Sequence, residues 1–443
     1  METPICDFVR QYADSGTVRL HMPGHKGKAY LGMETLDITE IPGADVLYAA
    51  QGVIRESEEN ASALFGSART LYSAEGSSLC IRAMLQLAQQ YARLRGRPPL
   101  IAAGRNAHRV FLEGAALLDL PIRWLGCGEG LLSPRPVFAE LEALFAGAEK
   151  PAAVYLSSPD YLGNELDLRP IAALCHRNSA LLLVDNAHGA YLRFLVPSRH
   201  PLDQGADLCC DSAHKTLPAL TGSAYLHLSA DCPKALLPMA EQAMALFAST
   251  SPSYLILQSL DALNPLLSGE YPARIRRMAE RLEACRAALA AASWELCGTE
   301  PLKLTLKPKS RGYTGEELAE ALMSAGFVPE FADPDHLVLM VTPETSEREL
   351  HTLTDFLCAL PARGALSERP PHRGAAETVL TPRQALLSPF ETVPVERCPG
   401  RILASPCVGC PPAVPIAICG ERLDEAALAL FCYYGVTELN VVL

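Results

Sequence analysis

Residues 180–189 read Ala-Leu-Leu-Leu-Val-Asp-Asn-Ala-His-Gly, an apolar run that ends in an aspartate and a polar turn. A short apolar run bounded by turn residues is typical of a buried strand in a parallel sheet. We therefore expect a strand at Ala180–Asp185. An open parallel sheet collects its ligands beyond the carboxyl ends of its strands, which places Asp185 where a ligand would lie.

The same alternation extends over residues 60–230, where helix-periodic segments alternate with short apolar runs. This pattern predicts βα units around a mostly parallel sheet, so the expected fold class is α/β. The clearest expected helices are Ser78–Leu94 and Leu168–Arg177, and the clearest further strands are Leu100–Ala103, Ala153–Ser157 and Ala206–Cys210.

The rest of the chain predicts a smaller α/β domain and a C-terminal domain. A long helix at Tyr271–Ala292 precedes a strand, a helix, a strand and a helix at 302–306, 315–325, 337–341 and 346–360. We expect an N-terminal segment with the large domain at 1–265, the small domain at 266–360, a Pro-, Gly- and Arg-rich linker at 361–376, and a C-terminal domain at 377–443.

The composition narrows the class of function. Of 443 residues, 49% are hydrophobic and 20% are charged, and the formal net charge is −12. This acidic balance argues against nucleic acid or an anionic membrane as a partner, since both prefer a basic face. No run approaches the roughly 18 apolar residues of a membrane-spanning helix, and the N-terminus lacks the pattern of a signal peptide. We expect a cytoplasmic protein that acts on a small molecule.

Fifteen cysteines are scattered through the chain. In a reducing compartment we expect them to be small buried hydrophobic residues without disulfides. Those in apolar segments include Cys80, Cys175, Cys209, Cys210 and Cys432. The CxxC motif Cys407–Cys410 has no second Cys or His pair at the spacing of a zinc site, so no metal is expected.

A lysine follows the strand expected at 206–210, in the sequence Ser212-Ala-His-Lys215. Ser212 and His214 can both donate to a phosphate, and a lysine beside them can form an imine. Upstream, Asp185 can pair with a pyridine nitrogen and keep that ring protonated. The combination favours a pyridoxal-5′-phosphate (PLP) site. Its alternatives are a solvated lysine and a strand-end aspartate that caps a turn.

Two further segments offer groups for such a site. Gly76, Ser77 and Ser78 open an expected helix, where backbone N–H groups and hydroxyls can hold a phosphate. Gly-Ser-Ser also serves as an ordinary helix cap. The strand expected at 100–103 leads into His108, whose imidazole either stacks on a cofactor ring or is only a polar loop residue.

Together these motifs resemble the ornithine/lysine/arginine decarboxylases of PLP fold type I, in their short form without an N-terminal regulatory wing. HxPGHK, DxAHG and SxHK in that order form the most specific part of the resemblance. The matching segments are His21–Gly27, Asp37–Gly43, Phe65-Gly66, Glu75–Ser78, Arg105–His108, Val184–Gly189, Ser212–Leu217, Pro411–Pro415 and Gly420-Glu421.

The resemblance implies decarboxylation of arginine, lysine or ornithine to the amine and CO2, in a homodimer or higher homo-oligomer with sites at the subunit interface. It implies that Lys215 holds PLP as a Schiff base, that Asp185 pairs with the ring nitrogen and that His108 stacks on the ring. It also implies that His188 lies by the imine. The residues implied to hold the phosphate are Ser77, Ser78, Ser212 and His214.

Five positions depart from the family pattern. The chain has Asn186 for the usual Glu, Arg109 for Lys, Glu75 for an amide, Gly222 for Gln, and Ala413 for the Gly of a Tyr-Pro-Pro-Gly-Ile-Pro run. Three hypotheses stay open: a decarboxylase of a basic amino acid, a PLP enzyme of another type such as an aminotransferase or lyase, and a PLP-binding homologue without turnover.

Overall fold

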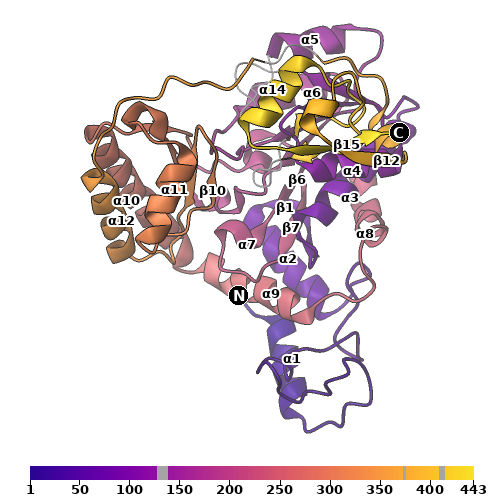
Figure 1. Ribbon diagram of the computed structural model, residues 1–443. Helices are drawn as coiled ribbons and strands as arrows, with labels where there is room; N and C mark the ends of the chain where they lie inside the picture. The colour runs from indigo at the N-terminus through magenta and orange to yellow at the C-terminus, as the bar shows by residue number, and fades with distance from the viewer. Residues whose placement is uncertain (127–137, 373–375, 409–414) are drawn as a thin grey trace. The chain divides into compact units, whose positions relative to one another are not determined.

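The computed structural model of this protein describes residues 1–126, 138–372, 376–408 and 415–443 (Figure 1). The chain forms two compact units, each assembled from segments that are discontinuous in sequence. The first unit consists of Met1–Pro99, Pro151–Ser158 and Asp167–Arg276, and the second of Leu100–Lys150, Pro159–Leu166 and Arg277–Leu443.

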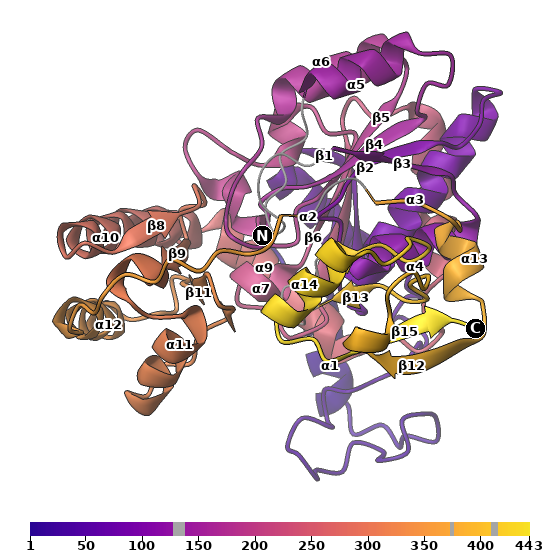
Figure 2. The ribbon, with the colours of Figure 1, turned by 45° about the horizontal axis from the view of Figure 1, so that its top comes forward.

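The first unit is built on strands in the order β1-β7-β6-β5-β4. The parallel pairs β4–β5 and β5–β6 form its centre, and Figure 2 labels these three strands. β7 runs antiparallel to both β6 and β1. Strand β5 is buried at every position, as expected for continuous apolar sequence in a parallel sheet. The strands are β1 Ser67–Ser73, β4 Ala153–Ser157, β5 Leu181–Asp185, β6 Leu208–Asp211 and β7 Ala224–Ser229.

Helices connect these strands. α3 packs against β1, β6 and β7, and α1 packs against α2 and α9. The helices are α1 Pro4–Asp14, α2 Val53–Phe65, α3 Gly76–Leu94, α6 Leu168–Arg177, α7 Ala213–Thr216, α8 Ala240–Ala245 and α9 Tyr254–Ser268, with 3-10 turns η1 Ala190–Phe194, η2 Pro201–Gln204 and η3 Lys234–Met239. α10, Tyr271–Ala291, begins in this unit and continues into the second.

The second unit contains the parallel pair β2 and β3, joined by α4, and an antiparallel sheet in the order β10-β11-β9-β8. Its helices α11 and α12 each begin with a capping box, in which Thr314 or Ser346 exchanges hydrogen bonds with a glutamate three residues on. The elements are β2 Ile101–Gly104, α4 Arg109–Leu118, β3 Ile122–Leu125, α5 Phe138–Ala146, β8 Glu295–Cys297, β9 Lys303–Lys307, η4 Pro308–Arg311, α11 Gly315–Ser324, β10 Phe331–Ala332, β11 Leu337–Met340 and α12 Glu347–Ala359.

The C-terminal segment, residues 377–443, belongs to the second unit and has its own apolar core. β12 pairs with β15, and β13 pairs with β14, both antiparallel. Core side chains include Val393, Leu403, Leu423, Phe431 and Val441. The elements are α13 Pro382–Leu386, β12 Phe390–Pro394, η5 Val395–Arg397, β13 Cys407–Val408, β14 Pro415–Ala417, α14 Glu425–Tyr433 and β15 Glu438–Val442.

Most of the expected elements are present. The strand at 153–157 and the helix at 168–177 have the expected bounds, and the strand expected at 206–210 is β6 at 208–211. Within the part of the chain that the structure describes, no helix is long and apolar enough to cross a membrane. The domain boundaries expected from the sequence stay a prediction.

Among the described cysteines, most are buried as expected, but Cys297 and Cys358 are only partly buried and Cys432 is exposed. Cys80, Cys175, Cys209 and Cys210 are buried free thiols. Cys432 is exposed, because the buried face of α14 is formed by other residues of that helix. Cys410 lies outside the described residues.

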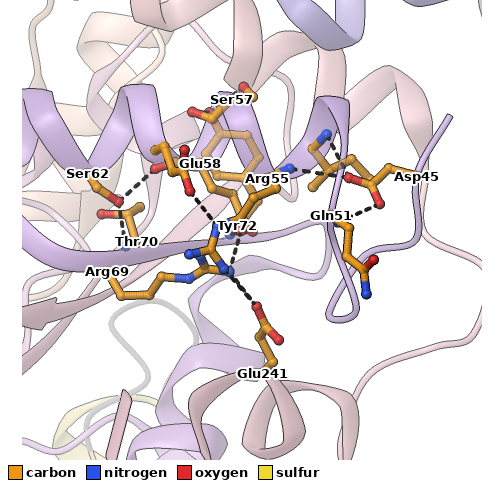
Figure 3. A network of polar contacts seen from close by, with 12 residues as sticks. Asp45, Gln51, Arg55, Ser57, Glu58, Ser62, Arg69, Thr70, Tyr72 and Glu241 are labelled. Carbon is orange, nitrogen blue, oxygen red and sulfur yellow. Dashed lines mark hydrogen bonds and ion pairs between the residues drawn. The ribbon is translucent and has the colours of Figure 1, made fainter. Parts of the chain in front are cut away.

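A buried arginine anchors β1 to α2 and α8 (Figure 3). Arg69 on β1 donates to Glu58 on α2 at 3.2 Å and also to Glu241 on α8. Glu58 accepts a second bond, of 3.0 Å, from the backbone N–H of Tyr72. Arg69 and Glu58 are both buried, so removing Arg69 would leave the buried Glu58 carboxyl without its cationic partner on β1. β1 is therefore held firmly where it leads toward the turn at Gly76.

One carboxylate organises the irregular segment before α2 (Figure 3). Asp45 has a φ of 71° and accepts backbone bonds of 2.7–3.4 Å from Val46, Gln51, Gly52, Ile54 and Arg55. Partial burial alone would raise the pKa of Asp45, but the backbone donors outweigh burial and lower the pKa from its ordinary 3.8. Asp45 thus acts as a remote cap for α2.

We expect Asp45→Asn to lower the free energy of unfolding by about 1–2 kcal/mol near neutral pH, because asparagine tolerates the left-handed backbone but has one acceptor oxygen and no charge. The pKa is lower in the folded than in the unfolded state. The stabilisation by Asp45 is therefore full well above its ordinary pKa and is lost as the pH falls through the folded-state pKa. Urea unfolding of both proteins from neutral to acidic pH measures this, and a difference that does not shrink on acidification contradicts it.

Candidate active site

Lys215 lies just past the carboxyl end of β6, in the short helix α7. Figure 1 labels both elements. Its Nζ is 3.1 Å from Nε2 of His188, which follows β5. Charged lysine has only donors, so the ammonium donates to the imidazole nitrogen. The structure thus brings together two predicted site residues from the ends of neighbouring parallel strands.

Asp185 ends β5 and is 6% exposed. Tyr155, on β4, donates its hydroxyl to Oδ2 at 3.2 Å, and the backbone N–H of Ala187 donates to Oδ1 at 3.2 Å. Burial, and then the charge of Asp185, raises the pKa of Tyr155 well above its ordinary value, so the phenol stays protonated. The Asp185 carboxylate is therefore held in one orientation at the strand end.

A cluster of hydroxyls lies at the N-terminus of α3. Ser212 donates to Ser77 across 2.9 Å between their Oγ atoms. Gly76 has a φ of 70° and donates its N–H to the carbonyl of Gly222 at 2.6 Å. The first N–H groups of a helix have no partner within it, so the first turn of α3, which includes Ser78, offers donors to an anion.

His214 is oriented by the backbone. Its Nδ1 lies 2.8 Å from the carbonyl oxygen of Ser223 and donates to it, because a carbonyl only accepts. Burial, with a smaller effect of the Lys215 charge, lowers the pKa of His214 and favours the neutral ring. Nε2 of that ring is an acceptor, so its donation to a phosphate would require uptake of a second proton.

His108 lies in the second unit, where it caps α4. Its Nδ1 accepts from the backbone N–H of Val110 at 3.3 Å. Arg105, in the turn between β2 and α4, donates two bonds to the Glu421 carboxylate, at 2.8 and 3.2 Å. The helix start that carries His108 is therefore supported from the C-terminal segment. The role of His108 toward a cofactor stays a prediction.

A buried carboxylate joins the strand ends of the site. Asp211, the last residue of β6, is fully buried and accepts from Nδ2 of Asn186 at 2.6 Å. Its other oxygen accepts from Nε2 of His200 at 3.0 Å and of His227 at 3.2 Å. Burial alone would raise the pKa of Asp211, but the two imidazoles hold it well below its ordinary value. Asp211 is therefore ionised.

Two departures from the family pattern have defined partners in the first unit. Asn186, fully buried, faces Asp211, and a Cβ on Gly189 would lie 2.0 Å from its Oδ1, which explains the glycine there. Glu75 accepts the backbone N–H of Ser249 at 2.7 Å, so this oxygen is bonded to the loop that precedes α9. The contacts of Asn186 and Glu75 therefore do not involve the hydroxyl groups of Ser77 and Ser212 near the start of α3.

Two other departures are also accommodated locally. Arg109 is more than half exposed and lies 3.8 Å from the carboxylate of Glu113, one turn along α4. Gly222 has a φ of 98°, which favours glycine, and a Cβ there would be 3.2 Å from the carbonyl oxygen of Ala74. The fifth departure, Ala413, lies outside the described residues.

Tyr155 and Asp211 were not predicted from the sequence. Tyr155 is one aromatic residue within a buried strand, and its bond to Asp185 requires knowing that β4 and β5 are neighbours. Asp211 stands directly before Ser212 at the end of an apolar run, and this position was the only feature of the sequence that could have pointed to it. An aspartate buried against two histidines distant in sequence could not be inferred from that position alone.

Comparison with known proteins places the chain among amino-acid decarboxylases. A family model described as Orn/Lys/Arg decarboxylase, major domain, matches residues 139–305. The uncharacterized protein YaaO of Bacillus subtilis is 30% identical, over 97% of this chain and 93% of its own length. An arginine decarboxylase of Bacillus subtilis is 28% identical, over 96% of this chain and 92% of its own length.

A solved structure agrees on the fold. Lysine decarboxylase A from Pseudomonas aeruginosa has a TM-score of 0.83 and 18% sequence identity, with 99% of this chain and 80% of that chain covered. The expected fold class is thereby confirmed: the protein has the α/β architecture of PLP fold type I enzymes. The chain belongs to the ornithine/lysine/arginine decarboxylase family, as its motifs indicated.

We expect Asn186→Asp to destabilise the fold by about 3 kcal/mol near neutral pH, because it replaces a donor to a buried carboxylate by a second carboxylate. One of the two acids would then have a raised pKa. The variant should approach wild-type stability at low pH and lose stability as the pH rises. Adding Asp211→Asn, which restores one acid and one amide, should recover part of the loss. Urea unfolding of the three proteins across this pH range tests it, and additive losses in the double variant would contradict the pairing.

Proposed function

We propose that this protein is a PLP-dependent decarboxylase of arginine, lysine or ornithine. The observation that carries the proposal is the pairing of Lys215 with His188 at the ends of parallel strands, one of which also presents Asp185. The arginine decarboxylase relative supports the reaction class. The net charge of −12 suits a cationic substrate.

The donors of the first unit suit the parts of this cofactor. The N-terminus of α3 with Ser77, Ser78 and Ser212 fits a phosphate, and Asp185 fits a protonated ring nitrogen. Lys215 would supply the amine that holds the cofactor. The buried hydroxyl of Ser157, which is in register with Asp185, has no hydrogen-bond partner among the described residues. The end of β4 therefore carries a hydroxyl that can hydrogen-bond to a bound ligand.

When bound, PLP supplies a protonated ring that accepts the electron pair left at the substrate carbon as CO2 departs. Asp185 stabilises the ring proton, and Tyr155 fixes the orientation of that carboxylate. Lys215 and His188 hold a proton between Nζ and Nε2, from which the substrate carbon can be reprotonated. The family resemblance implies that His108 would stack on the ring.

We expect the protein supplied with PLP to release CO2 and the matching amine from one basic amino acid in a panel of arginine, lysine, ornithine and neutral amino acids. Lys215→Ala should abolish both turnover and the visible absorbance of lysine-bound cofactor. Lys234→Ala, which changes an exposed lysine after β7, is the matched control and should leave both unchanged. Visible absorbance without CO2 release from any amino acid would instead indicate a homologue without turnover, and an oxo-acid product would indicate an aminotransferase.

We expect Asp185→Asn to retain bound cofactor but to lower the rate of CO2 release by about 100-fold or more, because an amide does not hold the ring nitrogen protonated. Tyr155→Phe removes only the hydroxyl that orients Asp185 and should cost about 10-fold or less. Turnover and absorbance titrations of both variants measure this. Near-normal turnover of Asp185→Asn would refute the assigned role.

A further inference from the structure

The turn that precedes His108 is tied to a residue 316 positions away. Arg105 reaches Glu421 through two parallel bonds, Nη1 to Oε1 at 2.8 Å and Nη2 to Oε2 at 3.2 Å. The Glu421 side chain is 2% exposed and that of Arg105 is 22% exposed. A bidentate arginine–carboxylate pair fixes direction as well as distance, which a single bond does not.

Glu421 is held rigidly on its own side of the pair. Its backbone N–H donates to the carbonyl of Ile418, its carbonyl accepts from Leu403, and its Oε2 accepts the N–H of Ile418 at 3.0 Å. The preceding Gly420 has a φ of 93°, and a Cβ there would lie 2.1 Å from the carbonyl oxygen of Leu380. The carboxylate that Arg105 meets therefore cannot shift without disrupting the core of the C-terminal segment.

The C-terminal segment also holds the other end of α4. Arg383, on α13, donates to the carbonyl oxygens of Ala116 and Leu117 at 2.8 and 3.1 Å, in the last turn of α4. A cation at these carbonyls satisfies acceptors that the helix leaves open and complements its dipole. α13 also packs directly against α4. The C-terminal segment therefore contacts both the turn that precedes α4 and the last turn of α4.

We propose that the C-terminal segment positions His108, and that Glu421, acting through Arg105, is the positioning residue. The proposal rests on the proposed function, because it takes His108 as the residue that stacks on the cofactor ring. Nδ1 of His108 is engaged by the N–H of Val110, so the ring follows the start of α4. The position of the start of α4 depends on the preceding residues around Arg105, and the ion pair with Glu421 fixes these residues in place.

Two variants weaken this link without changing His108. Glu421→Gln removes the charge and one of the two acceptor oxygens. Arg105→Lys keeps the charge but cannot form the bidentate pair. Glu377→Gln is the matched control, because it breaks an ion pair of 2.8 Å with Arg422, the residue next to Glu421, and leaves the turn at Arg105 untouched.

The first measurement is amide hydrogen exchange over residues 104–118 in the full-length protein without cofactor. Glu421→Gln and Arg105→Lys should both speed exchange there by about 10-fold, with little change in β5 and β6. Glu377→Gln should match the wild type over 104–118. Equal exchange in Glu421→Gln and Glu377→Gln would overturn the proposal, as would a uniform increase throughout the chain.

The second measurement is PLP affinity and the visible circular dichroism of the bound cofactor. Both link variants should raise the PLP dissociation constant by about 5- to 10-fold and change the dichroism, whereas the control should stay within about twofold. In a His108→Ala background, Glu421→Gln should have no further effect on either quantity, because its action passes through His108. An undiminished effect in that background would overturn the proposal. A wild type that binds no PLP would refute the proposed function itself, while the exchange experiment still tests the link to α4.

Discussion

The ionised carboxylate of Asp211 is the constraint on which the geometry of the site depends. A fully buried charge is tolerated only when hydrogen bonds replace its lost hydration, and the three side-chain donors come from separate parts of the first unit. Asn186 follows β5, His200 caps η2 and His227 lies within β7. Asp211 itself ends β6, so the strands that carry the proposed catalytic residues cannot slip past one another without exposing an unpaired charge.

The two carboxylates at these strand ends differ in what surrounds them. Asp211 accepts hydrogen bonds from two imidazoles and an amide, which replace the hydration that its charge loses on burial. Among the described residues, the hydrogen-bond donors to Asp185 are a phenol, a backbone N–H and the thiol of Cys210, none of them cationic. The charge of Asp185 therefore stays available to a cationic partner. A protonated pyridine ring is such a partner. The surroundings of Asp211 therefore suit a structural role, and those of Asp185 suit the proposed binding of a cationic ring.

The sequence was informative where structure is determined locally. The strand at Ala153–Ser157 and the helix at Leu168–Arg177 were predicted at their observed bounds because a short apolar run with a polar end and a helix-periodic segment are both local patterns. The motifs also pointed correctly to the decarboxylase family. The bond of Tyr155 to Asp185 and the pair of Arg105 with Glu421 were not predicted, because each requires knowing which distant segments become neighbours.

The departures from the family pattern bear on whether the protein turns over substrate. A changed residue leaves a site usable only where its own polar groups find partners that do not compete with the groups of the site. The carboxylate of Glu75 accepts a backbone N–H, Asn186 donates to Asp211, and Gly222 has a backbone conformation that favours glycine. Glu75 lies beside the α3 donors and Asn186 beside Asp185, so these altered residues preserve the helix start and the strand end from which the proposed site is built.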